Sequence, residues 1–138
     1  MKAYSEWKHD DVFEGNSEEG NKIVFDADSA HAHGASPMQA VLMALCACTS
    51  VDVVSILKKK RQEITGLRVS ASAERAENAP KVFTEIKLTY AVSGKVDRKA
   101  AEDAVSLSKN KYCSVSKMLE GTVKIDYEIV FPDVDPAK

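Results

Sequence analysis

The 138-residue sequence predicts a single α+β domain over residues 1–138, with antiparallel β-sheets packed against a long central helix. Two segments, 67–73 and 86–92, alternate apolar and polar residues, as strands with one buried face do. Between Pro37 and Leu57 the only formally charged residue is Asp52. A helix that is apolar on nearly every face is expected in the middle of a fold.

The remaining elements follow from local signals. Ser36 is a good N-cap, and Pro37 suits the first helical position, where its missing N–H costs nothing. Asp97 is expected to cap an amphipathic helix with Ala101, Ala104, Val105 and Leu107 on its inner side. The expected elements are strands at 3–7, 11–16 and 22–27, a helix at 37–57, a hairpin turning at 77–80, a helix at 97–111, a helical turn at 114–121, a last strand at 122–131 and a frayed tail.

Composition excludes several classes of protein. Charged residues make up 29% of the chain and the net charge is -2, so nothing favours nucleic acid or an anionic membrane surface as a partner. The N-terminus lacks the apolar core of a secretory signal, and the central helix carries many polar groups for a membrane span. Three cysteines, an odd number, favour reduced thiols and a cytoplasmic location.

The cysteines are the residues most able to carry chemistry. Cys46 and Cys48 lie about 200° apart around a helix, so they diverge, and their spacing does not suit a zinc site. Cys113 precedes a short helix whose free N–H groups can stabilise a thiolate. On these grounds alone, each cysteine is either a small buried hydrophobe or a reactive thiol.

Two motifs resemble those of the OsmC/Ohr family of small thiol-dependent peroxidases: SPMQAVLMALCACTSVDVV, and YCSVSKML further on. Pro37 and Gln39 match the family's helix start, and Cys48 falls on its reactive cysteine. Cys46 falls where the family has a small residue, which suggests packing. Cys113 matches the cysteine of the second motif, in which serine replaces the usual proline.

The resemblance implies an OsmC-like fold in an intertwined homodimer, and a two-cysteine mechanism. Cys48 would be the peroxidatic residue, which attacks an organic hydroperoxide and becomes a sulfenic acid. Cys113 would be the resolving residue, which forms a disulfide with it, and a dithiol reductant would reset the pair. No metal, flavin or haem is implied as a cofactor.

The site departs from the family pattern in its charged groups. Family peroxidases use an N-terminal arginine paired with a glutamate at the helix start, whereas no arginine precedes Arg61 here and Met38 stands at the glutamate position. His31 and His33 are the basic residues nearest to this helix in sequence. Three roles are open for them: neighbours of the site, metal ligands or ordinary loop histidines. We therefore expect slow peroxide reduction.

Two further sets of charged residues remain open. Asp52 lies one turn beyond Cys48, where it could accept a hydrogen bond across a dimer or cap a polar patch. Lys109, Lys111 and Lys117 either supply charge near Cys113 or are ordinary surface lysines.

Three functions remain open at this stage. The first is a thiol peroxidase with altered substrate choice, and the second is a redox-responsive or apolar-ligand-binding protein that uses a pocket between helices at the dimer interface. The third is a structural or interaction protein whose cysteines have no reaction to perform.

Overall fold

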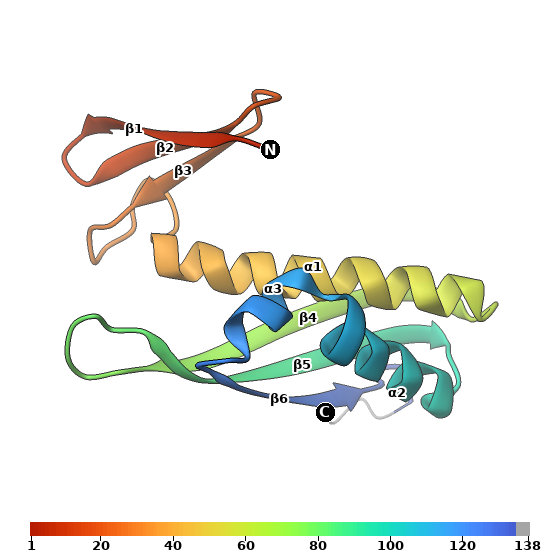
Figure 1. The fold of residues 1–138 in the computed structure, drawn as a ribbon. Helices are drawn as coiled ribbons and strands as arrows, with labels where there is room; N and C mark the ends of the chain where they lie inside the picture. Colours follow the sequence, from red (N-terminus) through yellow and green to blue (C-terminus); the bar gives the residue numbers. More distant parts are fainter. Residues whose placement is uncertain (135–138) are drawn as a thin grey trace. The chain divides into compact units, whose positions relative to one another are not determined.

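The computed structural model describes residues 1–134 in two compact units, which divide after Leu42 (Figure 1). The last four residues of the expected tail lie outside the described residues. In chain order the elements are β1 Ala3–His9, β2 Val12–Ser17, β3 Lys22–Asp26, α1 Pro37–Lys59, β4 Glu63–Arg75, β5 Phe83–Lys95, α2 Arg98–Leu107, a π-helical turn η1 Ser108–Tyr112, α3 Ser114–Leu119 and β6 Lys124–Val130. The α+β class and the long helix are confirmed.

The N-terminal unit contains an antiparallel sheet in the order β1-β2-β3, and its three strands are those expected at 3–7, 11–16 and 22–27. Gly15 on β2 allows Phe25 of β3 to lie close against the strand. A Cβ atom at Gly15 would come within 2.7 Å of the Phe25 ring, closer than such contacts occur in proteins. The side chain of Phe25 therefore covers the backbone of its neighbouring strand.

The start of α1 is fixed by a reciprocal pair of hydrogen bonds. The Gln39 N–H donates to Ser36 Oγ at 3.1 Å, and the Ser36 N–H donates to Gln39 Oε1 at 2.9 Å. This is a capping box, which satisfies two of the free N–H groups that begin any helix. The predicted N-cap is confirmed, and the helix extends to Lys59, two residues further than expected.

One stripe of α1 is buried, and it belongs to the C-terminal unit. Its members recur every four residues and are Leu45, Thr49, Val53 and Leu57. By length and composition α1 would also suit a membrane span. Within the described chain, however, Thr49 hydrogen-bonds to Tyr90 of β5, which ties this stripe to the sheet as a core helix does.

The C-terminal sheet has the order β4-β5-β6, and its buried face is the one that alternation predicted. The inward residues of β5 are at most 1% exposed and are Ile86, Leu88, Tyr90 and Val92. The expectation of purely antiparallel sheets was wrong at β6, which pairs in parallel with β5. The α2-η1-α3 segment crosses over between these strands, and a crossover of this length joins parallel neighbours.

The predicted helix over 97–111 divides into α2 and the wider turn η1. Asp97 caps α2 as expected, and Ala101, Ala104 and Val105 are fully buried. Leu107 was expected to face inward but is 39% exposed. Ser108 takes the inward position instead, because it lies three and four residues beyond the buried Val105 and Ala104.

Candidate functional site

The C-terminal unit brings two cysteines together. Cys48 lies near the middle of α1 and is half-buried, whereas Cys113 lies between η1 and α3 and is fully buried. The Cys48 thiol lies close enough to Cys113 to act on its ionisation, although 65 residues separate the two in sequence. Both are free thiols in this structure. The pair that the sequence motifs singled out is therefore assembled in space.

Burial dominates the ionisation of Cys113. Desolvation raises its pKa to about 11, and the neighbouring Cys48 and the negative charge of Asp52 act in the same direction. The Ser116 N–H at the start of α3 donates to Cys113 Sγ at 3.4 Å and opposes them. The expected stabilisation of a thiolate by this helix is thus present but outweighed, so Cys113 is a protonated thiol at neutral pH.

A chain of hydrogen bonds runs beside the cysteine pair. Tyr90 Oη lies 2.8 Å from Thr49 Oγ1, which lies 2.7 Å from Ser108 Oγ. The Ser108 hydroxyl donates to Asp52 Oδ2 at 2.9 Å. Since a serine hydroxyl has only one hydrogen to donate, Thr49 must donate to Ser108, and Tyr90 must donate to Thr49. The chain is therefore polarised toward the Asp52 carboxylate.

Asp52 opens toward solvent at a small cleft. The cleft has a volume of about 290 Å³. It is lined by Val51, Asp52, Ser55, Ile56, Lys59, Leu107 and Tyr112. Of the two roles left open for Asp52, the structure shows a hydrogen bond within the same chain, from Ser108.

Two buried groups in this site make the folded chain less stable at alkaline pH. Burial raises the pKa of Cys113 from 9.0 to about 11 and that of Tyr90 from 10.0 to about 12. Because the folded chain holds these protons more tightly, their stabilisation is complete below pH 9 and is lost as pH rises toward 12.

We expect the free energy of unfolding by urea to fall by roughly 2 kcal/mol between pH 8.5 and pH 11 from Cys113 alone. The Cys113→Ser variant should show a shallower decline, since serine does not titrate in this range. Equal declines in the two proteins would contradict the burial of an ionisable thiol here.

The other predicted site residues belong to the N-terminal unit. Gln39 is engaged in the capping box described above, and Met38 is half-buried beside it in α1. His31 Nδ1 lies 2.9 Å from the Asp26 carbonyl oxygen, and the His33 N–H donates to Asp26 Oδ2 at 3.1 Å. The two histidines thus help to order the loop around Asp26.

The described part of the chain contains no cluster of side chains that could bind a metal ion. Among residues 1–134, no group of three or more His, Cys, Asp or Glu side chains is placed to hold an ion. A hydrogen bond from the Asp28 N–H is the main cause that lowers the pKa of Asp26, with His33 contributing. The H-x-H motif therefore has a structural explanation.

Two of the three lysines near Cys113 in sequence, Lys111 and Lys117, have other contacts. Lys117 pairs with Glu120 at 2.9 Å, and the Lys111 ammonium lies 5.3 Å from the centre of the Tyr112 ring. Both side chains are exposed. These contacts are those of ordinary surface lysines.

Sequence reasoning did not identify three members of the hydrogen-bonded chain, namely Tyr90, Thr49 and Ser108. Tyr90 was assigned to the apolar face of its strand, and Ser108 was assigned no role. The available signal was Thr49, a polar residue on the inward stripe of an apolar helix. Burial raises the pKa of the Cys46 thiol, in keeping with a packing residue.

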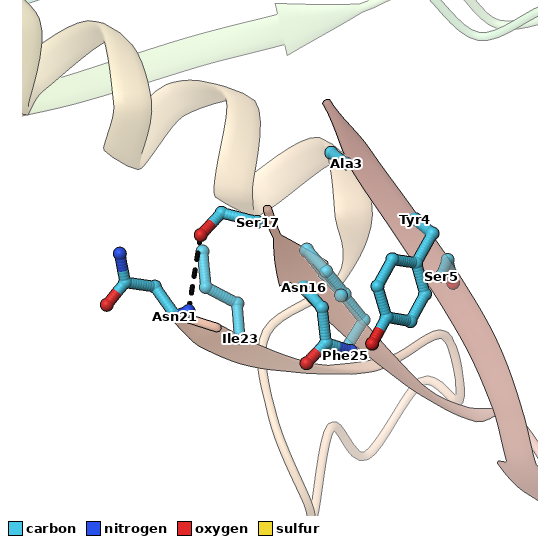
Figure 2. Close-up of a pocket in the computed structure, with 9 residues that line it drawn as sticks. Ala3, Tyr4, Ser5, Asn16, Ser17, Asn21, Ile23 and Phe25 are labelled. Atoms are coloured by element: carbon cyan, nitrogen blue, oxygen red, sulfur yellow. Dashed lines mark hydrogen bonds between the residues drawn. The ribbon is translucent and has the colours of Figure 1, made fainter. Parts of the chain in front are cut away.

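The N-terminal unit has a separate hollow of about 480 Å³ on its sheet (Figure 2). Its walls come from all three strands, and Figure 2 shows Tyr4, Ile23 and Phe25 among them. The residues that line it are Ala3, Tyr4, Ser5, Gly15, Asn16, Ser17, Asn21, Ile23 and Phe25. It contains neither a thiol nor a carboxylate, so it suits binding of an apolar group rather than a reaction.

Comparison with known proteins places this chain in a family. Residues 29–128 match the model of OsmC-like proteins. Protein YhfA of Escherichia coli K12 is 44% identical over 133 residues, covering 94% of this chain and 98% of YhfA.

Two solved structures show the same fold. A hypothetical protein from Aquifex aeolicus shares 35% identity at a TM-score of 0.81, with 94% of this chain and 96% of that chain covered. An organic hydroperoxide resistance protein from Elizabethkingia anophelis shares 15% identity at a TM-score of 0.72, with 94% of each chain covered. On the family match and the YhfA identity, this chain belongs to the family of OsmC-like proteins.

Proposed function

We propose that the protein is a thiol-dependent reductase of organic hydroperoxides, in which Cys48 is peroxidatic and Cys113 is resolving. The observation that carries the proposal is the proximity of these two thiols, one half-buried and one fully buried, which lets Cys48 act on the ionisation of Cys113. Family membership supports it, since a structural neighbour is named an organic hydroperoxide resistance protein.

The chemistry proceeds in two balanced steps. The Cys48 thiolate attacks the outer oxygen of the hydroperoxide, the O–O bond breaks, and an alcohol leaves after taking up a proton. Cys113 then attacks the Cys48 sulfenic acid, which forms a disulfide and releases water. A dithiol reductant restores both thiols, so that the protein itself needs no metal, flavin or haem.

The test is consumption of peroxide by the wild-type protein with a dithiol in excess. We expect cumene hydroperoxide to be consumed faster than hydrogen peroxide, because the helix that carries Cys48 is apolar. Failure to consume either peroxide above the rate of the dithiol alone would contradict the proposal.

We also propose that the protein is a homodimer in which α1 is covered by a second copy. Only one stripe of α1 is buried within the chain, while Met43 is 58% exposed and Val51 is 70% exposed on the helix. A second copy would remove this apolar surface from water.

Sedimentation at micromolar concentration should show a dimer, and Val51→Lys should shift it toward monomer. A wild-type protein that sediments as a monomer would contradict this part of the proposal.

A second candidate function is binding of a small apolar ligand in the hollow of the N-terminal sheet. Its volume of about 480 Å³ lies within the range of ligand pockets, and its exposed wall includes Tyr4 and Ile23. Tight binding of an apolar ligand without peroxide consumption would favour this function over the first.

A further inference from the structure

The buried position of Cys113 conflicts with its proposed role as an attacking thiol. It is fully buried, and burial holds its pKa at about 11, so that its proton does not leave spontaneously at neutral pH. To attack a sulfur on Cys48, however, Cys113 must lose that proton. The residue that accepts it must be close to the thiol and must have a route to solvent.

Asp52 meets both requirements. It lies one helical turn from Cys48. Ser108 joins it to Cys113, because the Ser108 hydroxyl donates to Asp52 Oδ2 at 2.9 Å and the Ser108 carbonyl oxygen accepts from the Cys113 N–H at 2.8 Å. It also lines the cleft of about 290 Å³, through which a proton could leave. A carboxylate is a proton acceptor at neutral pH.

We propose that the Asp52 carboxylate accepts the proton of Cys113 when this thiol displaces a leaving group from Cys48, and that Ser108 positions the carboxylate for this transfer. The proposal rests on the two-cysteine function proposed above and adds a proton acceptor to it.

The hydrogen-bonded chain explains how the carboxylate is held. Ser108 donates to Oδ2 of Asp52 and is itself held by Thr49, on the same helix as Asp52. Within residues 1–134, Oδ1 has no hydrogen-bond donor of its own. One oxygen is thus fixed by the protein, while the other remains able to accept a proton.

The step is balanced for any leaving group on Cys48. A disulfide bond forms between Cys113 and Cys48 as the bond between the Cys48 sulfur and its leaving group breaks. The pair of electrons departs with the leaving group, and the thiol proton moves to Asp52 and from there to the leaving group or to solvent. In the peroxidase cycle the leaving group is hydroxide, which becomes water.

Acceptance of a proton and simple electrostatic repulsion make opposite predictions for Asp52→Asn. If Asp52 acted through its charge alone, removing the charge would favour the Cys113 thiolate and accelerate its attack. If Asp52 is the acceptor, the same change slows the attack. Other titratable groups that border it are Cys48, Lys59 and Tyr112, with Tyr90 linked through the hydrogen-bonded chain.

The attack of Cys113 can be measured without peroxide in a Cys46→Ser background. The reagent is the symmetrical disulfide of nitrothiobenzoate. It labels Cys48 in a bimolecular phase and releases one coloured nitrothiobenzoate thiolate. Cys113 then displaces the second in a unimolecular phase, whose rate does not depend on reagent concentration. The Cys113→Ser variant should lack this second phase.

We expect Asp52→Asn to slow the second phase ~10-fold or more at pH 7, and the deficit to shrink as pH rises and hydroxide takes over. Asp52→Glu, which keeps the carboxylate, should recover part of the rate, and Ser108→Ala should show a smaller loss. Asp126→Asn, an exposed residue on β6, serves as the matched control and should leave the rate unchanged.

An unchanged or faster second phase in Asp52→Asn overturns the proposal, as does the absence of this phase in the Cys46→Ser parent. If Asp52→Asn fails to fold, an unchanged or faster second phase in Ser108→Ala overturns it instead. Since the assay contains no peroxide, failure of the peroxidase function would appear separately, as normal closure of the cysteine pair without peroxide consumption.

Discussion

Cys48→Ser will abolish reduction of cumene hydroperoxide, leaving only the uncatalysed rate of the dithiol. A serine hydroxyl is not ionised at neutral pH and does not form the sulfenic acid on which the cycle depends. We expect a loss of at least ~10³-fold relative to wild type, since nothing else in the proposed cycle supplies a nucleophile. The measurement is peroxide consumption under a fixed excess of dithiol.

Cys46→Ser is the matched control for this substitution, because it changes the same atom two residues away on the same helix. It should retain most of the activity, and peptide mapping after oxidation should find one disulfide, Cys48–Cys113. A disulfide between Cys46 and Cys113, or equal losses in the two serine variants, would show that the assignment of the peroxidatic residue is wrong.

The second large effect is the dependence of activity on pH. Without a neighbouring cation a cysteine thiol is mostly protonated at pH 7, because an unperturbed cysteine has a pKa of ~8.5. No arginine precedes Arg61, and Met38 stands where the family motif has a glutamate. Peroxide reduction should therefore be slow at pH 7 and rise roughly tenfold or more by pH 9.

The initial rate with cumene hydroperoxide, measured at several pH values from 6 to 9.5, checks this expectation. The rise with pH is smaller than the gain in thiolate alone if a second step limits turnover, so the first turnover is the quantity to follow. A fast reaction with a flat profile would mean that another residue supplies the charge, and His31→Ala and His33→Ala should then be measured first.

The elements were predictable from the sequence where their signals are local. Alternation places Ile86, Leu88, Tyr90 and Val92 on one buried face whatever the rest of the fold does, and a serine before Pro37 caps a helix in the same way anywhere. The direction of β6 was missed because the choice of a neighbouring strand depends on how the crossover packs, and no pattern within β6 itself records it.

The site was predictable only in part, for a related reason. The motifs indicated Cys48 and Cys113. The pKa of Cys113, however, depends on two opposing effects, a hydrogen bond that lowers it and burial that raises it. A hydrogen bond at the start of α3 is visible in the sequence as a helix signal, whereas the depth of burial is not. Tyr90 illustrates the same limit, since its ring follows the strand pattern and its hydroxyl takes part in a polar chain that only the packed structure forms.

The wide turn η1 determines the direction in which the chain presents Cys113. The Cys113 N–H donates to the Ser108 carbonyl oxygen at 2.8 Å, a span of five residues in place of the four of an α-helix. Such a turn accommodates one additional residue, and each residue of an α-helix adds about 100° of rotation. The number of residues in this segment therefore determines the direction in which the Cys113 side chain points. Loss of one residue from 108–112 would turn Cys113 away from Cys48, although both cysteines would still be present.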